Sequence, residues 1–351
     1  MAEENQTTHK RRVRYSGKYP KKFEEKYKEL QPEKYKDTIE HVIKKGNTPA
    51  GMHISIMVNE ILDFLKIQPG ETGFDATLGY GGHTKAMLQC LNGQGHIYAT
   101  DVDPEESART RKRLEEAGFG EDILTIRLQN FCTIDEIAKE AGGFDFILAD
   151  LGVSSMQIDN PKRGFSFKVD GPLDLRLNQE AGISAAERLA AITKDELAGM
   201  LYENSDEPYC EELAKAITDE IRKGSRIDTT TKLRNIIEKT LDFLPEKEKK
   251  DTIKKTCQRT FQALRIDVNR EFEVLYEFME KLPDALKPGG RAAILTFHSG
   301  EDKLVKKALK EGYRAGIYAD YAKDVIRPSA QECAQNGRAR STKMRWAIKA
   351  E

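Results

Sequence analysis

The sequence lacks the long apolar segments of membrane and secreted proteins. No apolar run in its 351 residues reaches the roughly 18 residues needed to cross a bilayer. The first residues also include no apolar stretch as long as a signal peptide requires. We therefore expect a cytoplasmic protein without a membrane partner.

Paired cysteines are missing too, because the five cysteines are scattered and never form a C-x-x-C motif. This argues against a disulfide framework and a zinc site, and we expect no bound metal.

Neither sign of charge dominates, since the formal net charge is −1 at pH 7. Two runs of basic residues without an acid lie near the two ends of the chain. Residues 9–22 hold seven basic side chains, two interleaved tyrosines and no acid, and residues 336–349 hold five more basic side chains, again without an acid. These runs predict local contact with the phosphates of a nucleic acid. A solvated tail is the alternative for any single charge run.

Alternating strand and helix patterns begin near residue 53 and predict an α/β fold. The near-continuous apolar residues of the last strand in the series are typical of a buried parallel strand. The four predicted strands are residues 72–76, 96–101, 123–128 and 144–150. The predicted helices between them are residues 84–91 and 104–117. This order is the signature of a doubly wound sheet.

The α/β pattern pauses after Asp150, where a helical segment is inserted. Residues from about 182 to 255 predict helices, two of which start at capping boxes that open on Ser184 and Thr193. The elements predicted outside this segment are a helix at 32–45, a helix at 272–286, a turn at 288–290 and a strand at 291–297. A helical insert between strands of one sheet therefore explains the chain length without a second independent core.

A glycine-rich loop, Gly79-Tyr80-Gly81-Gly82-His83, joins the first strand to its helix. Glycines let the backbone approach a ligand closely, and the start of a helix offers free N–H groups. Asp101, 19 residues after Gly82, ends the second strand, where a carboxylate can bind both hydroxyls of a ribose. The loop therefore predicts a nucleoside-containing cofactor. For His83 taken alone, a capping or packing histidine is the alternative.

Two cofactor classes fit such a loop: dinucleotides and S-adenosylmethionine. The dinucleotide fingerprint G-x-G-x-x-G has a third glycine that permits tight helix packing. Counted from Gly79, that place is taken by Thr84, and Tyr80 and His83 crowd the loop. We therefore favour S-adenosylmethionine, with a dinucleotide-dependent dehydrogenase as the alternative.

Asp150 ends the fourth predicted strand. Ligands of open α/β sheets bind beyond the carboxyl ends of the strands, so Asp150 should face the cofactor, and a capping or turn aspartate is the alternative. The polar loop that follows contains Arg163, Phe165, Phe167 and Arg176. Aromatic rings are suited to stacking on a base and arginines to holding phosphate. A packed phenylalanine pair is the alternative.

Several motifs follow one another in order along residues 53–349. They are His53-Ile54, Gly81-Gly82-His83, Asp150-Leu151-Gly152-Val153-Ser154-Ser155, Arg163-Gly164-Phe165-Ser166-Phe167, Phe261-Gln262-Ala263-Leu264-Arg265-Ile266, Phe297-His298-Ser299 and Arg338-Ala339-Arg340-Ser341. In this order they resemble the bacterial ribosomal small-subunit RNA (cytosine-N4) methyltransferase family, also called MraW or RsmH. The resemblance leaves only the N-terminal extension uncovered.

The resemblance implies an α/β, Rossmann-like S-adenosylmethionine-dependent methyltransferase with an inserted helical domain. It implies a target cytidine in 16S ribosomal RNA near the P site, and so the small ribosomal subunit as partner; a homodimer is left open. The implied cofactor contacts are Gly81, Gly82, His83, Asp101, Phe131, Asp150 and Gln157. The expected segments are a basic extension (1–50), the first part of the methyltransferase domain (51–160), a substrate-binding helical insert (161–257), and the second part of that domain with a basic C-terminal tail (258–351).

The sequence also departs from the family pattern. Tyr80 stands where the family usually has glycine or another residue, two leucines (Leu175 and Leu177) replace methionines, and Gly300 and Lys303 replace the usual leucine and arginine. Together with the long extension, these departures fit a paralogue whose target nucleotide differs.

Methylation of an amine conjugated to a pyrimidine ring needs the amine to be oriented and its developing charge to be stabilised. We assign this work to Asp150, acting electrostatically or as proton acceptor, on a single-stranded or flipped cytidine. His298 is expected to line the same pocket as a second catalytic residue, and a turn histidine bonded to backbone is the alternative. An RNA-binding ribosome-assembly factor with a vestigial cofactor pocket is the competing function.

Overall fold

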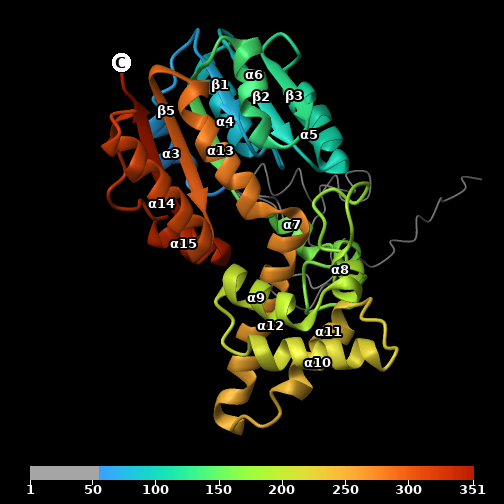
Figure 1. The fold of residues 1–351 in the computed structure, drawn as a ribbon. Coiled ribbons are helices and arrows are strands. Elements are labelled where there is room, and N and C mark those ends of the chain that lie inside the picture. Colours follow the sequence, from blue (N-terminus) through green and yellow to red (C-terminus); the bar gives the residue numbers. More distant parts are fainter. Residues whose placement is uncertain (1–54) are drawn as a thin grey trace, which may run out of the picture. The chain divides into compact units, whose positions relative to one another are not determined.

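Seven strands of the described chain form one sheet in the order β3-β2-β1-β4-β5-β7-β6 (Figure 1). β1 to β5 are parallel, whereas β7 runs antiparallel to both β5 and β6. The computed structural model describes residues 55–351, so the basic run at 9–22 and the helix predicted at 32–45 lie outside the described residues. The strands are Thr72–Asp75 (β1), His96–Asp101 (β2), Leu124–Leu128 (β3), Phe144–Asp150 (β4), Leu286–Thr296 (β5), Tyr318–Tyr321 (β6) and Lys343–Lys349 (β7).

The strand order reverses between β1 and β4. The chain first adds β2 and β3 on one side of β1 and then returns to its other side. In open α/β sheets, ligands bind at this switch point, beyond the carboxyl ends of the strands. The four strands predicted between residues 72 and 150 are β1 to β4, with ends that agree within one residue. The predicted fold class, a doubly wound α/β sheet with a helical insert, is confirmed.

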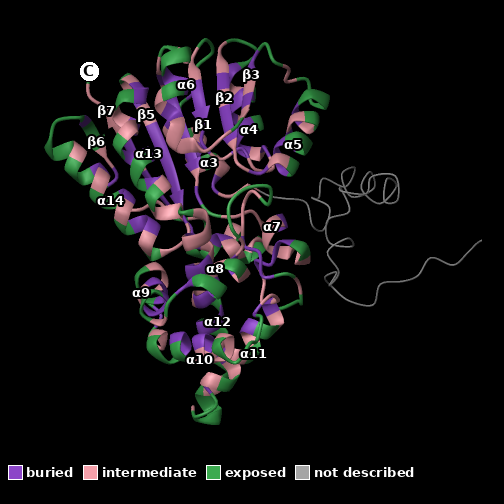
Figure 2. Cartoon of the chain, turned by 45° about the vertical axis from the view of Figure 1, so that its right-hand side comes forward, coloured by how far each residue is buried: buried purple, intermediate pink, exposed green. Residues whose placement is uncertain are grey.

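Helices cover both faces of the sheet (Figures 1 and 2). One face is covered by Val58–Leu65 (α3), Gly82–Leu91 (α4) and Pro104–Glu116 (α5). The other face is covered by Ile134–Ala141 (α6), Glu271–Ala285 (α13) and Ser299–Arg314 (α14). Because both faces are buried, the central strands are apolar throughout rather than alternating.

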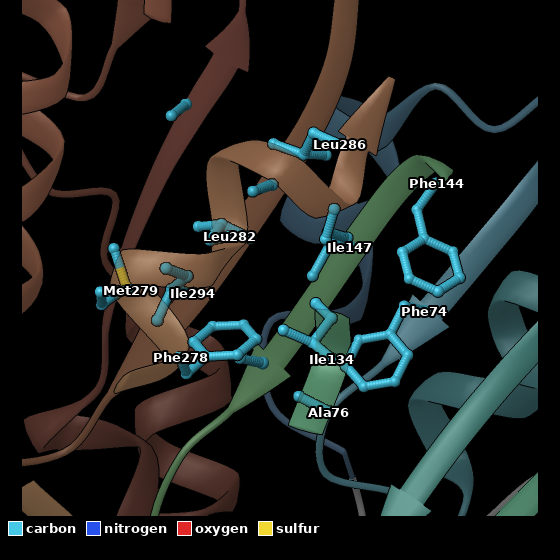
Figure 3. Packing of buried hydrophobic residues seen from close by; sticks show 14 of the residues in the cluster. Phe74, Ala76, Ile134, Phe144, Ile147, Phe278, Met279, Leu282, Leu286 and Ile294 are labelled. Carbon is cyan, nitrogen blue, oxygen red and sulfur yellow. The ribbon is translucent and has the colours of Figure 1, made fainter. Parts of the chain in front are cut away.

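β4 shows this double burial most clearly. Phe146 and Leu148 point into the core formed with α3 and α4, whereas Ile147 and Ala149 point into the core formed with α6 and α13. The reason is that successive side chains of a strand lie on opposite faces. Figure 3 shows Ile147 of β4 and Phe278 of α13 as members of the second of these cores.

The turn predicted at residues 288–290 lies inside β5 instead. The pairing of β4 with β5 shifts register between Phe144 and Phe146, opposite this part of β5. Gly289 takes a left-handed conformation with φ of 70°, which glycine adopts readily. The Pro-Gly-Gly sequence therefore produces an irregularity within a strand and not a break before it.

The helical insert has a core of its own (Figures 1 and 2). Ser155–Asp159 (α7) leads into the insert, whose helices are Ala185–Ala191 (α8), Lys194–Ser205 (α9), Cys210–Arg222 (α10), Thr230–Thr240 (α11) and Glu246–Asn269 (α12). Both predicted capping boxes are present, at Ser184 for α8 and Thr193 for α9. α12 runs without interruption through the boundary expected at residue 257, and the insert core reaches Leu264. The domain division therefore stays a prediction, with one long helix crossing its boundary.

The basic C-terminal segment is part of the sheet and not a tail. Lys343–Lys349 is β7, preceded by the short helices Ala330–Gln335 (α15) and Gly337–Ser341 (η4). Arg345 is buried, and its Nε donates to Oδ1 of Asp302 (2.7 Å), while Nζ of Lys343 donates to Oδ2 of Asp302 (2.8 Å). Both charges are paired with Asp302 within the fold. Lys343 and Arg345 are therefore not available to contact RNA, contrary to the prediction. No helix in residues 55–351 is long and apolar enough to cross a membrane.

Candidate active site

A cavity of about 610 Å³ lies at the carboxyl ends of β1, β2 and β4, at the switch point of the sheet. This volume is in the range of small-molecule sites. Its walls come from the glycine-rich loop, the strand ends, the start of the insert and the last turns of α12. It brings together all of the predicted site residues except Arg163 and Arg176. Those lining it are Gly81, Gly82, His83, Asp101, Phe131, Asp150, Gln157, Phe165, Phe167 and His298.

Asp101 fixes the glycine-rich loop at the end of β2. Its Oδ2 accepts a hydrogen bond from the N–H of Gly79 (2.8 Å), and its Oδ1 accepts one from the N–H of Asp103 (2.9 Å). Burial raises the pKa of Asp101 to about 6, although these two N–H groups oppose the rise. Each carboxylate oxygen can accept a second bond, so Asp101 still has capacity for the hydroxyls of a ribose.

Gly81 explains why the loop needs glycine. It caps α4 with φ of 79°, a left-handed conformation that other residues rarely adopt. A Cβ at this position would also lie 2.6 Å from Cγ2 of Thr110 on α5. The hydroxyl of Thr110 in turn donates to the carbonyl of Gly79 (2.6 Å). The loop is thus held against α5, which fixes the start of α4 beside the cavity.

Asp150 ends β4 with one oxygen unpaired. Its backbone N–H donates to Oγ1 of Thr77 (2.7 Å), and its Oδ2 lies 3.4 Å from Nδ1 of His83. Its Oδ1 is buried and has no hydrogen-bond partner. Burial raises the pKa of Asp150 to about 6. A buried oxygen without a partner costs free energy, so this position is suited to receiving a donor from a bound ligand.

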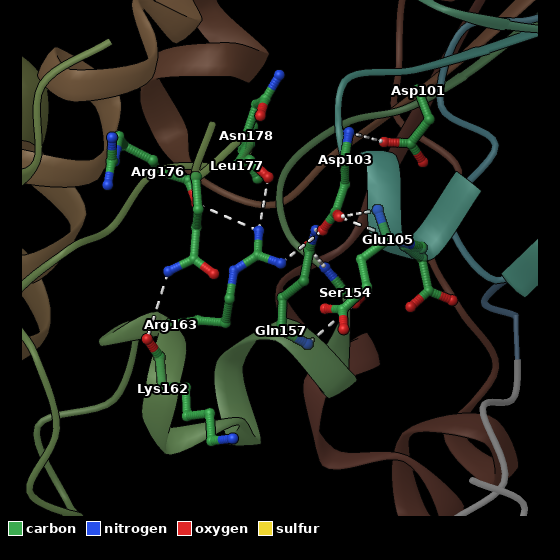
Figure 4. Close-up of polar contacts among 12 residues, drawn as sticks. Asp101, Asp103, Glu105, Ser154, Gln157, Lys162, Arg163, Arg176, Leu177 and Asn178 are labelled. Carbon is green, nitrogen blue, oxygen red and sulfur yellow. Dashed lines mark hydrogen bonds and ion pairs between the residues drawn. The ribbon is translucent and has the colours of Figure 1, made fainter. Parts of the chain in front are cut away.

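Asp103 connects the cofactor end of the cavity to the insert (Figure 4). Its Oδ1 accepts from the N–H groups of Glu105 and Glu106 and so caps α5. Its Oδ2 accepts from Nε2 of Gln157 (3.0 Å) and from Nη1 of Arg163 (2.7 Å). The role of Asp103 was not predicted from the sequence. The only local signal was an aspartate directly before a proline, which marks a helix start but not a junction.

Arg163 and Arg176, the two arginines predicted to bind substrate, lie outside the cavity. Arg163 is buried, and besides Asp103 it donates to the backbone carbonyls of Arg176 and Leu177. Arg176 is paired with Asp174 through two hydrogen bonds, of 2.9 and 2.8 Å. Neither arginine lines the cavity. Arg163 therefore joins Asp103 to the backbone behind the cavity wall.

Phe165 and Phe167 line the cavity from the insert side. Phe167 meets Phe261 of α12 edge to face, with ring centroids 5.7 Å apart, and Phe165 is nearly buried in the insert core. The packed and the base-stacking interpretations of this pair are thus compatible, because the rings both belong to the insert core and reach the cavity. On the opposite wall, Phe131 packs against Phe278 of α13.

His298 lies between β5 and α14 beside a buried glutamate. Its Nε2 is 3.0 Å from Oε1 of Glu301, whose Oε2 accepts from the N–H of Phe297 (2.7 Å). Burial alone would raise the pKa of Glu301, but the contact with His298 and the N–H of Phe297 outweigh it and lower the pKa. Glu271 completes a group with ligand atoms close enough for a metal ion. Both oxygens of Glu271 already accept from Arg265, however, so the charge of Glu271 is compensated without a metal ion.

The cofactor end of the cavity is acidic. None of the ion pairs in the part of the chain that the structure describes joins Asp101 or Asp150 to a lysine or arginine. Two carboxylates without such partners repel a diphosphate and attract a cation. The unpaired Oδ1 of Asp150 points to the same preference. A sulfonium cofactor therefore fits these residues, although Asp101 could hold the ribose of either cofactor class.

The amino-acid sequence of the chain matches a known protein family. Residues 50–350 match the model of the MraW methylase family. The ribosomal RNA small subunit methyltransferase H 1 of Agathobacter rectalis is 86% identical over 351 residues, which is 100% of both chains. The protein of the same name from Lachnoclostridium phytofermentans is 70% identical and covers 99% of this chain and 95% of its own.

A more distant relative matches a smaller share of this chain. The ribosomal RNA small subunit methyltransferase H of Fusobacterium nucleatum is 38% identical over 310 residues, which is 84% of this chain and 95% of its own. The two relatives with the numbered name thus match nearly the whole of this chain, and this unnumbered relative matches less of it. The family model also starts only at residue 50.

Proposed function

This chain belongs to the MraW methylase family, and we propose that it transfers a methyl group from S-adenosylmethionine to the exocyclic N4 of a cytidine near the P site of small-subunit ribosomal RNA. It is an enzyme, and its cofactor supplies an electrophilic methyl carbon on a sulfonium. The names of its relatives support the RNA substrate. The dehydrogenase alternative is excluded by the family assignment.

The observation that carries the proposal is the unpaired Oδ1 of Asp150 at the end of β4. The N4 lone pair of cytosine is delocalised into the ring and is therefore a weak nucleophile. As N4 bonds to carbon it gains positive charge and must lose one proton. A fixed carboxylate oxygen with no other partner can accept a hydrogen bond from the amine and stabilise that charge, and can then accept the proton.

The other lining residues divide into two ends of the same cavity. At the cofactor end, Asp101 would hold a ribose, while the loop from Gly79 to His83 and Gln157 complete the wall. At the insert end, Phe165 and Phe167 would stack on the target base. In a helix the amine of cytosine is engaged in pairing, so the enzyme needs a single-stranded or flipped nucleotide, and stacking on aromatic rings stabilises such a base.

The partner that follows from this proposal is the small ribosomal subunit, which also places the reaction in the cytoplasm. A ribosome-assembly factor with a vestigial pocket is disfavoured, because Asp150, His83 and the glycine-rich loop are all in place around the cavity. The homodimer stays open. We also propose that the chain is a paralogue within the family, since the relatives that match it along nearly its full length carry numbered names.

The test is methyl transfer to purified small ribosomal subunits with S-adenosylmethionine labelled in the methyl group. The RNA is then digested, the labelled nucleoside is identified by chromatography, and its position is mapped by mass spectrometry. We expect N4-methylcytidine at one position near the P site. Label on a carbon or on a ribose oxygen would contradict the substrate, and label at another cytidine would contradict the P-site assignment alone.

A further inference from the structure

His83 is held in one tautomer by the backbone. Its Nε2 lies 2.8 Å from the carbonyl oxygen of Ile56, and its side chain is only 7% exposed. A carbonyl oxygen can only accept, so Nε2 carries the hydrogen. The other nitrogen, Nδ1, faces Oδ2 of Asp150 at 3.4 Å. In the neutral ring, Nδ1 therefore presents a lone pair to the carboxylate.

Two acceptors that face each other make no hydrogen bond until a proton joins them. The ionised Asp150 with neutral His83 has none, and the pair gains its bond when one proton arrives on either group. Groups coupled this closely bind protons as a pair. The two atoms 3.4 Å apart thus form no hydrogen bond before a proton is accepted, and they form one afterwards.

The surroundings of the pair favour taking up that proton. The charged groups that face it are Asp75 at the end of β1 and Glu301 on α14, both acidic. Burial raises the pKa of Asp75 as well, despite its bonds from Thr84 and Thr77. Negative groups close to a buried carboxylate make its protonation easier. The pair is therefore poised to accept a proton released in the cavity.

We propose that His83 is a positioning residue that makes Asp150 the proton acceptor of the methyl transfer. The inference rests on the proposed function. N4 forms its bond to the methyl carbon while the carbon–sulfur bond breaks and sulfur keeps the electron pair. The amine then gives one proton to Oδ1 of Asp150, and the N–H electron pair returns to nitrogen. A half-turn of the carboxyl group, whose terminal torsion is soft, brings the new O–H to Nδ1 of His83, which accepts its hydrogen bond.

The first test reads the pair directly, without turnover. In protein labelled with ¹⁵N in histidine and ¹³C in aspartate, NMR should show His83 with its hydrogen on Nε2 and a bare Nδ1. In His83→Gln, the midpoint of the Asp150 carboxyl titration should move to lower pH, because the protonated carboxyl group loses the nitrogen that accepts its O–H. A hydrogen on Nδ1 of the neutral ring, or an unchanged carboxyl titration, would overturn the proposal.

The second test reads the chemistry. Glutamine at position 83 can still donate to the carbonyl of Ile56, so His83→Gln removes Nδ1 and keeps the anchor. At saturating cofactor, its single-turnover rate should fall by about 10²-fold, and the acid limb of its pH profile should move to lower pH, with RNA affinity unchanged. His96→Gln, at the opposite end of the sheet, is the control and should match the wild type.

The outcomes separate the two proposals. If the wild type makes N4-methylcytidine and His83→Gln is slower by the same factor at every pH, His83 is only structural and the inference is overturned. If the wild type makes no N4-methylcytidine, the proposed function fails, and the NMR titration still decides whether His83 and Asp150 act as a pair.

Discussion

Nη1 of Arg163 lies 2.7 Å from Oδ2 of Asp103, in an ion pair whose side chains are only 5% and 3% exposed. The two residues are far apart in sequence and belong to different parts of the fold, since Arg163 begins the insert and Asp103 follows β2. The same aspartate caps α5 and accepts from Gln157 (Figure 4). The pair therefore fixes the insert against the strand end that carries Asp101.

We predict that breaking this pair destabilises the protein strongly. Arg163→Ala and Asp103→Ala each leave a buried charge without a partner, which typically costs about 3–5 kcal/mol. The double variant should lose clearly less than the sum of the two, because it leaves no lone buried charge. Urea unfolding of the four proteins measures this. Arg127→Ala is the control, since its pair with Glu140 is exposed and worth at most about 1 kcal/mol; additive losses would contradict the coupling.

The contrast between Asp101 and Asp103 shows how far the sequence determines the site. Asp101 and Asp150 were predictable, because each ends an apolar strand and the ends of parallel strands meet at one edge of the sheet. Asp103 was not, since its partner Arg163 is 60 residues away and no local pattern joins them. The same long-range pairing misled the interpretation of Arg163, whose charge looked available for phosphate.

The RNA contact predicted for Lys343 and Arg345 in the C-terminal segment was wrong for a related reason. Its basic residues resembled a nucleic-acid contact, but Arg345 and Lys343 pair with Asp302 of α14. Whether a charge is free depends on what the fold brings beside it, and β7 is brought there only by inserting between β5 and β6. Predictions from local patterns were confirmed more often. The capping boxes at Ser184 and Thr193 are present, and each involves residues only three apart.

We predict that Asp101 is needed for cofactor affinity. Asp101→Ala should weaken S-adenosylmethionine binding by about tenfold or more, because charge-assisted hydrogen bonds to the ribose are lost and the N–H of Gly79 loses its acceptor. Calorimetric titration of the cofactor measures it. Asp122→Ala, an exposed aspartate before β3, should bind normally. Equal affinity of the two variants would remove Asp101 from the site.

We predict that Asp150 lowers stability at neutral pH. Its pKa rises from 3.8 to about 6 on folding, so the folded state binds this proton more tightly than the unfolded state does. Stability from this group is therefore complete below about pH 4 and is lost as the pH rises through about 6. Asp150→Asn should raise the free energy of unfolding by about 1–3 kcal/mol at pH 7. We expect the lower part of this range, because the side chain of Asp150 is 22% exposed to solvent.

Urea unfolding as a function of pH measures this gain. It should shrink towards zero below about pH 4, where Asp150 is protonated in both states. A constant difference between variant and wild type at all pH values would show that the substitution acts through packing and not through the charge.

We predict that the basic run at residues 9–22 contacts RNA phosphates without reading sequence. Deleting residues 1–49, which precede the family match, should weaken binding to small-subunit RNA. It should also flatten the dependence of affinity on salt, because fewer counterions are released. Binding titrations at several salt concentrations measure this, with cofactor affinity as the control. A salt slope equal to that of the full chain would show that the run makes no phosphate contact.

The central claim is that Asp150 acts on the amine during methyl transfer, and single-turnover transfer to small ribosomal subunits by Asp150→Asn tests it most directly. At saturating cofactor, the rate of N4-methylcytidine formation should fall by about 10²–10⁴-fold, because a neutral amide neither stabilises the developing charge nor accepts the proton. RNA affinity should be unchanged, and the variant should be at least as stable as the wild type at neutral pH. A near-normal rate from this folded variant would show that Asp150 is structural and would contradict the account.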